Sequence, residues 1–153
     1  MTIWKSCFFR QKERRTVISL ALLAFVQTSV ASTGAASYSE AHKTMTQTGR
    51  PIVVLVGADW CPGCRVMKTT AMPQVQQQGG LERVAFATVN TDHEPTLARE
   101  LMGGGSIPQL IMYYQTAAGW QRRVMVGAQS PAAIQQFINQ SVTTPAPSAL
   151  GRR

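Results

Sequence analysis

Apolar runs and apolar residues at helical spacing alternate along residues 38–142. The runs 52–56 and 84–89 are largely aliphatic or β-branched, which predicts two strands that are covered on both faces. On either side of these runs, apolar residues recur every three or four positions, as on the buried face of a helix. We therefore predict helices at 38–48, 61–78, 92–102 and 130–142, and strands at 52–56, 84–89, 110–114 and 120–126.

Residues typical of helix ends and turns refine these boundaries. Asp92 and Ser130 are of the type that caps a helix N-terminus, so each is expected to begin the helix that follows it. Pro73 lies inside the predicted helix 61–78 and is expected to kink or break it, because proline lacks an N–H group. The short connection 115–119 predicts an antiparallel hairpin between the last two strands.

The predicted elements follow the order helix, strand, helix, strand, helix, strand, strand, helix. Helices that connect strands imply right-handed crossovers, and the final hairpin adds antiparallel pairing. The sequence thus predicts an α/β fold with a central mixed four-stranded sheet and helices on both faces. It contains no internal repeat, and 153 residues is a usual length for one domain.

Residues 1–31 have the three-part layout of a secretory signal peptide. A basic segment precedes the uncharged run 16–30, which is shorter than the roughly 20 residues of a membrane-spanning helix. Small residues at Ser29 and Ala31 suit cleavage after Ala31. We expect a cleaved signal peptide and a periplasmic location, with an uncleaved membrane anchor as the alternative. The remaining chain then divides into a linker at 32–37, a domain at 38–142 and a flexible tail at 143–153.

The net charge of +8 gives little further information about function. Half of it lies in the leader, where five basic residues stand against one acidic residue. The other basic residues form no run longer than a pair and are not interleaved with aromatic residues. Binding to nucleic acid is therefore not expected.

Cys61 and Cys64 are the only cysteines outside the leader, which contains Cys7. A disulfide between positions three apart closes almost no loop and can add little stability, so redox chemistry explains the pair better. A zinc site would need further ligands, and His42 and His93, both expected at the surface, are not spaced as a pair. No metal and no cofactor are expected.

At the start of a helix, Cys61 would be the more exposed thiol, and unpaired N–H groups would favour its ionised form. Cys61 would then attack a substrate disulfide, and Cys64 would release the reduced substrate from the mixed disulfide. Trp60 and Pro62 are expected to form an apolar rim that contacts the substrate.

Four segments carry motifs that occur together: Ala58-Asp59-Trp60-Cys61-Pro62-Gly63-Cys64, Val89-Asn90-Thr91-Asp92, Ile107-Pro108 and Val126-Gly127-Ala128. With these motifs the chain resembles the thioredoxin family over about residues 38–142. The resemblance implies a thioredoxin fold in which Pro108 follows a cis peptide bond and lies beside the cysteine pair. It also implies that the backbone of Ile107 pairs with an extended substrate chain, and that Gly127 permits close backbone approach at the same edge.

The sequence departs from the family pattern in three places. Proline precedes glycine between the cysteines, where thioredoxins have the reverse order. Leu55 takes the place of a buried acid that assists deprotonation of the second cysteine, and Thr88 takes the place of its lysine neighbour. The second cysteine would then need water or another base; Asp59 is close in sequence but is expected to be solvated.

These features predict an exported thiol–disulfide oxidoreductase that reduces or exchanges disulfides of envelope proteins through Cys61 and Cys64. Similarity to exported reductase modules that receive electrons from a membrane partner makes a membrane electron donor a further expected partner. Two alternatives stay open, namely a disulfide-forming oxidase and a module that delivers Cu(I) through the two thiolates. The protein is expected to act as a monomer on protein thiols and disulfides.

Overall fold

The computed structural model describes residues 35–142. The predicted signal peptide, its cleavage site, the first half of the linker and the tail lie outside the described residues. The elements are α1 (Tyr38–Thr48), β1 (Ile52–Gly57), α2 (Pro62–Val66), the π-helical segment η1 (Met67–Ala71), α3 (Met72–Gln77), β2 (Ala85–Asn90), α4 (Pro95–Met102), β3 (Gln109–Thr116), β4 (Gly119–Val126) and α5 (Pro131–Val142).

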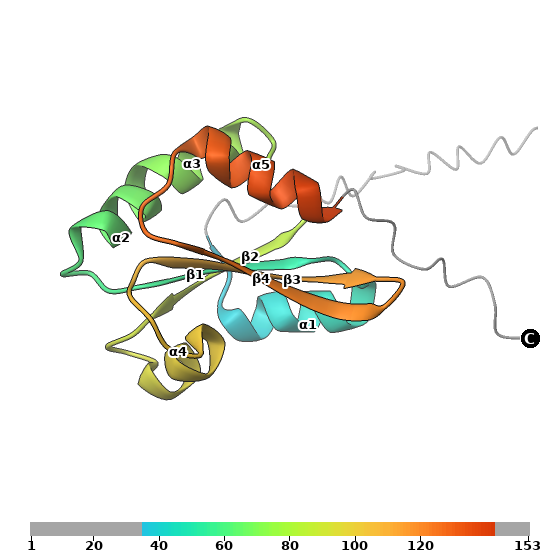
Figure 1. The fold of residues 1–153 in the computed structure, drawn as a ribbon, viewed down its shortest axis with the longest axis horizontal. Coiled ribbons are helices and arrows are strands. Elements are labelled where there is room, and N and C mark those ends of the chain that lie inside the picture. Colours follow the sequence, from blue (N-terminus) through green and yellow to red (C-terminus); the bar gives the residue numbers. More distant parts are fainter. Residues whose placement is uncertain (1–34, 143–153) are drawn as a thin grey trace, which may run out of the picture. The chain divides into compact units, whose positions relative to one another are not determined.

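The four strands form one mixed sheet in the order β2-β1-β3-β4. β1 and β2 are parallel, whereas β3 is antiparallel to both β1 and β4. α3 and α5 cover one face of the sheet, and α1 and α4 cover the other (Figure 1). The predicted α/β fold, with a central mixed four-stranded sheet and helices on both faces, is confirmed.

Each face of the sheet has its own hydrophobic core. Leu55 of β1 belongs to the core that includes Ile134 of α5, and its neighbour Val54 belongs to the core that includes Ala41 of α1. All residues of 52–56 are buried because successive side chains of a strand point to opposite faces and both faces are covered. This explains why the run shows no polar alternation.

The helix α1 has the boundaries predicted from its spacing, Tyr38–Thr48. The hydroxyl of Ser37 accepts a hydrogen bond from the N–H of Glu40 at 3.3 Å, and the Glu40 carboxylate accepts one from the N–H of Ser37 at 3.0 Å. This reciprocal pair is a capping box, which satisfies two donors that a helix start otherwise leaves free. Gly49 ends the helix with φ 72°, and its N–H donates to the Met45 carbonyl.

Pro73 is predicted to kink or break the helix. It does not break it: the helical path continues from Pro62 to Gln77 through three consecutive segments. Before the proline the helix widens in η1, where the N–H of Met72 donates to the carbonyl of Met67, five residues earlier. In an α-helix, the proline ring would clash with the carbonyl four residues earlier. The π-helical segment changes that spacing, so the proline is accommodated without ending the helix.

The prediction that Asp92 caps the next helix is wrong. α4 begins at Pro95, with Glu94 in the N-cap position and no hydrogen bond from a capping side chain. The N–H of Asp92 instead donates to the side-chain oxygen of Asn90 at 2.9 Å, which holds Asp92 in a turn directly after β2. Pro95 can begin the helix without a polar cap because its φ is preset and it has no N–H to satisfy.

Two other predictions at turns and helix ends are confirmed. β3 and β4 form an antiparallel hairpin, although the pairing extends to Thr116 and Gly119 and the turn is shorter than predicted. The hydroxyl of Ser130 caps α5 by accepting a hydrogen bond from the N–H of Ala133 at 3.3 Å.

β4 lies at the edge of the sheet, and two consecutive arginines tie it to helices on both faces. Arg122 donates to the carbonyls of Leu101 and Met102, at the end of α4, at 2.7 and 3.1 Å. Arg123 donates to the hydroxyl of Ser141 in α5 at 3.1 Å. The guanidinium of Arg122 thus satisfies carbonyls that a helix end leaves free, and the pair fixes the strand that leads into the β4–α5 connection.

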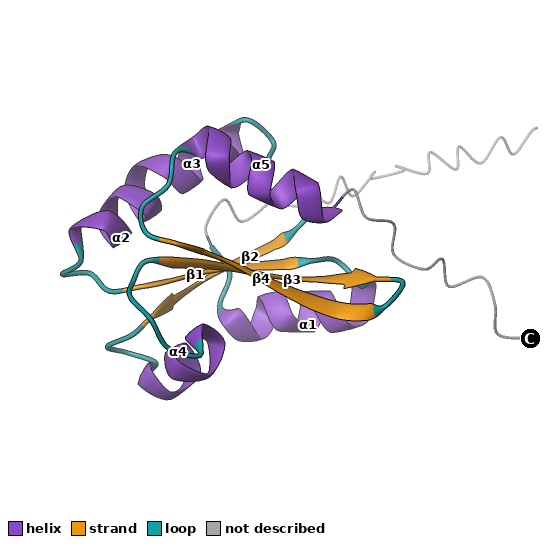
Figure 2. Cartoon of the chain, in the orientation of Figure 1, coloured by secondary structure: helices purple, strands orange, loops and turns teal. Residues whose placement is uncertain are grey.

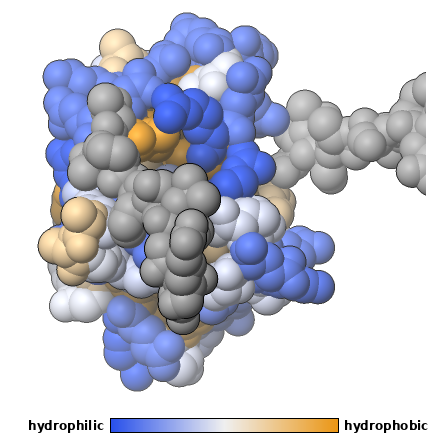
Figure 3. Space-filling view, turned by 90° about the vertical axis from the view of Figure 1, so that its right-hand side faces the viewer, coloured by the Kyte–Doolittle hydropathy of each residue, from blue (hydrophilic) through white to orange (hydrophobic). Residues whose placement is uncertain are grey.

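On the face shown in Figure 3, at the end away from α2, hydrophilic and near-neutral residues predominate, and hydrophobic residues show in small separate areas. Within residues 35–142, no helix combines the length and apolar character needed to cross a membrane. The large hydrophobic side chains exposed in this part of the chain are Trp60, Val66, Trp120 and Val126.

Candidate active site

Three loops gather at the end of the sheet where β1 and β2 finish (Figure 2). The β1–α2 loop leads to the cysteine pair, the α4–β3 loop ends at Pro108, and the β4–α5 connection begins at Gly127. The N–H of Gly127 donates to the Pro108 carbonyl at 2.8 Å. A Cβ atom added at Gly63 would lie 3.3 Å from Cδ of Pro108, so these two segments are in close contact. The fold therefore joins three motifs that lie far apart in the sequence.

Cys61 and Cys64 form a disulfide, with their Cα atoms 5.2 Å apart. Cys61 is the N-cap residue of α2, and Pro62 occupies the first turn, as predicted. The backbone N–H of Cys64 donates to Sγ of Cys61 at 3.3 Å. An N–H group directed at a sulfur favours the thiolate, so this geometry supports ionisation of Cys61 once the disulfide is reduced.

Cys61 is expected to be the more exposed cysteine, and in the disulfide form the difference from Cys64 is only slight. Cys61 is 6% exposed and Cys64 is 5% exposed. Both are covered because they form a small apolar cluster with Ala58 and Ile107. Any difference between the roles of the two cysteines must therefore arise from their surroundings and not from exposure.

The segment before β3 lies against Cys61. The Ile107–Pro108 peptide bond is cis, and the Ile107 carbonyl oxygen lies 4.0 Å from Sγ of Cys61. Gly127 has φ 86°, a conformation that favours glycine, at the point where its N–H meets Pro108. The structure thus places Ile107 and Pro108 beside the cysteine motif and Gly127 beside Pro108, and their role in substrate binding stays a prediction.

Apolar side chains are exposed on the same segments. Trp60 is 66% exposed and Pro62 is also exposed, as expected for a rim around the cysteines. Val66 of α2 and Val126 at the end of β4, which are 52% and 50% exposed, add to these residues and were not predicted. Val126 could have been found from its position directly before Gly127, whereas the sequence gives no separate signal for Val66.

Gly57, at the end of β1, is a further residue that the sequence did not single out. A Cβ atom added at Gly57 would lie 2.9 Å from both Cβ and Sγ of Cys64. Only glycine leaves enough room for Cys64 at this position. Its place at the junction between a buried strand and the cysteine motif was the available signal.

A pocket of about 40 Å³ lies beside Cys64. Leu55 and Thr88, which the resemblance matched to an acid and a lysine, face each other in the register of β1 and β2 and both line this pocket. Asp59 and Lys68 also contribute to its wall. The surroundings of Cys64 therefore combine an apolar inner side with charged groups near the surface.

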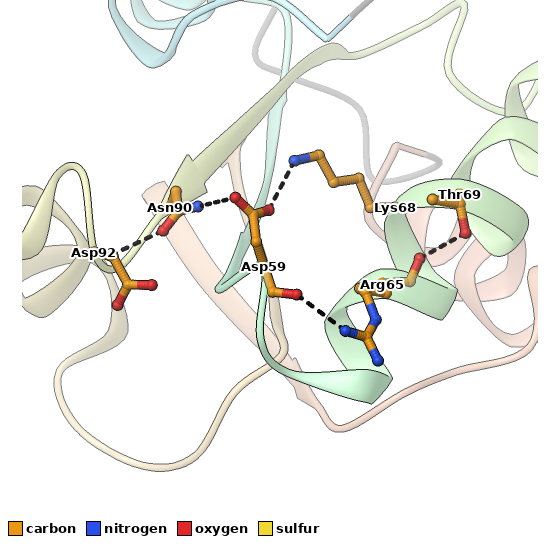
Figure 4. Close-up of polar contacts among 6 residues, drawn as sticks. All are labelled: Asp59, Arg65, Lys68, Thr69, Asn90 and Asp92. Atoms are coloured by element: carbon orange, nitrogen blue, oxygen red, sulfur yellow. Dashed lines mark hydrogen bonds and ion pairs between the residues drawn. The ribbon is translucent and has the colours of Figure 1, made fainter.

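Asp59 holds a fixed position beside this pocket (Figure 4). Its Oδ1 lies 3.3 Å from Nζ of Lys68, and its Oδ2 accepts a hydrogen bond from Nδ2 of Asn90 at 3.0 Å. The Asp59 side chain is 65% exposed, so it is solvated as expected, and Arg65 and Lys68 lie on the exposed face of the helix. A surface ion pair of this kind contributes at most about 1 kcal/mol, so orientation is its main effect.

The two histidines lie at the surface, as predicted. His42 is next to the ring of Tyr38, with the ring centroids 5.7 Å apart. In the described part of the chain, no three His, Cys, Asp or Glu side chains lie close enough together to hold a metal ion.

The geometry allows a disulfide to be transferred reversibly between the cysteine pair and a substrate dithiol. By class, the protein is a thiol–disulfide oxidoreductase. The family model for thioredoxin matches residues 32–140, and the chain belongs to the thioredoxin family. This match confirms the resemblance seen in the sequence motifs.

Solved structures with this fold include a thioredoxin from Thermus thermophilus, which is 23% identical with a TM-score of 0.59, over 70% of this chain and 85% of that one. A thioredoxin from Malassezia sympodialis is 24% identical with a TM-score of 0.54, over 69% of this chain and 85% of that one. Trxlp from Edwardsiella tarda is 28% identical with a TM-score of 0.53, over 67% of this chain and 95% of that one. A comparison with curated protein sequences gives no match.

Proposed function

We propose that the protein is exported and that it reduces or exchanges disulfides of envelope proteins. The observation that carries the proposal is the position of Cys61, at the start of a helix, with the Cys64 N–H at 3.3 Å from its sulfur and the Ile107 carbonyl at 4.0 Å. Thioredoxin-like proteins act on protein thiols and disulfides, which supports protein substrates. The signal-peptide layout of residues 1–31 supports export to the periplasm.

In the reducing direction, the Cys61 thiolate attacks one sulfur of a substrate disulfide and forms a mixed disulfide. The other substrate sulfur leaves as a thiolate and takes up a proton. Cys64 then attacks Sγ of Cys61, which closes the disulfide described above and releases the second substrate sulfur. The pair must be reduced again before the next cycle, and we propose a membrane protein as the electron donor.

The activity is tested by following reduction of a generic protein disulfide with dithiothreitol as the electron source. Wild-type protein should accelerate the reaction, and the variant Cys61→Ser should not. Equal rates for the two proteins would contradict the proposed activity.

The direction of transfer is tested by equilibrating the cysteine pair in glutathione buffers. A reduction potential near about −270 mV suits a reductase, and one near about −120 mV would favour the alternative oxidase. Stoichiometric Cu(I) binding without disulfide turnover would favour the delivery module instead.

Export is tested by expressing the full chain in a bacterium with an outer membrane and sequencing the protein recovered from each fraction. We expect a periplasmic protein that begins at Ser32 and sediments as a monomer. An uncut chain in the membrane fraction would favour the anchor, and an uncut chain in the cytoplasm would contradict export. Partners are captured with Cys64→Ser, which should retain the mixed disulfide.

A further inference from the structure

Cys64 can attack Cys61 only after its thiol has lost a proton, because the thiolate is the nucleophile. Cys64 is 5% exposed, so this proton cannot pass directly into bulk solvent. The side chains of Leu55 and Ala58, which lie nearby, cannot accept it. A path from Cys64 to an acceptor must therefore run through the pocket beside it.

The pocket has the size and the polar groups that such a path requires. Its volume of about 40 Å³ exceeds the roughly 10–15 Å³ that one water molecule needs. Thr88 and Asn90 line it, and a hydroxyl and an amide are groups that can form hydrogen bonds with water. Cys64 and Asp59 both contribute to its wall, so one water molecule or two can link them.

Asp59 is the one proton acceptor among the charged groups that line this pocket. The others are Arg65, at the start of the helix, and Lys68, in η1, and both are cations near neutral pH. β2 contributes Thr88, Val89 and Asn90, none of which is charged. Of the described residues on the pocket wall, Asp59 therefore has the only carboxylate.

The Asp59 carboxylate is held in place from two sides. Nδ2 of Asn90 donates to one oxygen at 3.0 Å, and Lys68 lies 3.3 Å from the other. The orientation of Asn90 is itself fixed, because its Oδ1 accepts the N–H of Asp92 at 2.9 Å (Figure 4). Only this orientation of the amide satisfies both contacts, since the donor must face the carboxylate and the acceptor must face the N–H.

We propose that Asp59 accepts the proton of Cys64 through water in this pocket. The inference rests on the proposed exchange at Cys61 and Cys64. In that step, the Cys64 S–H bond breaks and its proton passes through water to Asp59. The Cys64 thiolate forms the bond to Sγ of Cys61, and the bond from Cys61 to the substrate sulfur breaks. That sulfur leaves as a thiolate, so no other reactant is needed; in the reverse direction, the water-linked path returns a proton to Cys64.

The carboxylate need hold the proton only briefly. A thiol is a weaker acid than a carboxylic acid, so Asp59 acts as a general base while the Cys61–Cys64 bond forms. The Asp59 side chain is 65% exposed and can pass the proton on to solvent. Exposure on one side and contact with the pocket on the other are both required for this role.

The test separates attack by Cys61 from attack by Cys64. Reduced full-length protein is mixed rapidly with a nitrobenzoate disulfide that releases one coloured thiolate at each step. All proteins carry Cys7→Ser, so that Cys61 and Cys64 are the only thiols. The first phase then reports attack by Cys61, and the second reports attack by Cys64.

The variant Asp59→Asn keeps the size of the side chain and removes the acceptor. We expect the rate of the second phase to fall by about 10- to 100-fold near neutral pH, at or below the low end of general-base effects, because water can still accept the proton. The first phase should not slow. In the variant, the rate of the second phase should increase steadily from about pH 6 to 9, because the thiol must then ionise without the carboxylate. In wild-type protein, this rate should depend less on pH. Asp59→Glu should restore most of the rate.

The matched control is Asp92→Asn, which removes the same charge from an exposed residue that does not line the pocket. It should leave both phases unchanged. Unchanged second-phase kinetics in Asp59→Asn, or equal slowing of both phases, would overturn the role of Asp59 while leaving the proposed function intact. Wild-type protein that releases only one coloured thiolate would instead contradict the proposed function itself.

Discussion

The two cysteines of this protein are equally buried but have different surroundings. Cys61 lies next to two backbone groups, the N–H of Cys64 and the carbonyl of Ile107. Exposed apolar side chains, such as that of Trp60, lie on the same segment. Cys64 meets Gly57 and the pocket whose wall includes Asp59. The first environment suits contact with a substrate chain, and the second suits movement of a proton.

Burial alone therefore does not assign roles within a cysteine pair. The disulfide form shows 6% and 5% exposure, values too similar to distinguish an attacking sulfur from a resolving one. The assignment follows instead from which neighbours can contact a substrate and which can accept a proton. Substitutions on either side should therefore affect different steps.

The largest effect is expected from replacing the cysteines themselves. Cys61→Ser should abolish disulfide reduction, because no sulfur remains at the helix start to attack the substrate. Cys64→Ser should still attack a disulfide once and should then stop as a mixed disulfide. Mass spectrometry after reaction with a small disulfide checks both outcomes. A stable adduct on Cys61→Ser, at residue 64, would reverse the assignment.

The next largest effect is expected where a glycine makes room for Cys64. Gly57→Ala would place a methyl group 2.9 Å from both Cβ and Sγ of Cys64. We expect a loss of about 1–3 kcal/mol in the free energy of unfolding, as for an overpacked core, and slower attack by Cys64. Denaturant unfolding and the second phase of thiolate release measure these effects.

The control for this variant is Gly63→Ala, on the side of Cys61, where the closest approach would be 3.3 Å to Cδ of Pro108. Its added methyl group is less crowded, so the loss of stability should be smaller. The second phase should also be less affected than in Gly57→Ala. Equal changes in the free energy of unfolding and in the second-phase rate for the two alanine variants would contradict the difference between the surroundings of Cys61 and Cys64.

A smaller effect is expected at the rim beside Cys61. Trp60 is 66% exposed, so Trp60→Ala should change stability little. Loss of roughly 1 kcal/mol of apolar contact would lower kcat/KM for a protein disulfide about five-fold. Reduction of glutathione disulfide, which is too small to cover the rim, serves as the comparison. An equal loss with both substrates would indicate damage to Cys61 and not to substrate contact.

The smallest effect is expected far from both cysteines, in the capping box of α1. Hydrogen bonds from the hydroxyl and then the N–H of Ser37 lower the pKa of Glu40 from 4.5. The ionised carboxylate therefore stabilises the folded state above pH 4.5, and this contribution is lost as pH falls through the lowered pKa. Glu40→Gln should reduce stability slightly near neutral pH, with a difference that vanishes in acid. Unfolding curves at several pH values check this, and both thiolate phases should stay unchanged.

Much of the fold could be predicted because local patterns and tertiary packing agree. The unbroken apolar run 52–56 indicated a strand covered on both faces, and the spacing of Tyr38–Thr48 gave the boundaries of α1. The cysteine motif and the Ile107-Pro108 motif indicated the site before their contact was known. Each of these signals is contained within a short stretch of chain.

The remaining parts of the site depend on register, which short motifs do not specify. Asn90 reaches Asp59 because β2 runs parallel to β1 and pairs Gly57 with Asn90. Asp92 looked like a helix cap, but it lies in a turn held by Asn90, and the helix begins only at Pro95. The clash that makes Gly57 necessary also involves two elements, β1 and α2. Contacts between elements therefore account for most of what the sequence left out.

The π-helical segment η1 determines the orientation of the cysteine pair relative to α3. A regular α-helix rotates by about 100° per residue, so one extra residue between Met67 and Met72 turns everything before it relative to everything after it. Removing a single residue from this segment would give a regular helix in which α3 keeps its core contacts while α2 and the cysteine pair face another direction. The number of residues in this helix therefore determines the orientation of the cysteine pair. A one-residue deletion, which a surface loop would tolerate, would rotate the pair about the helix axis.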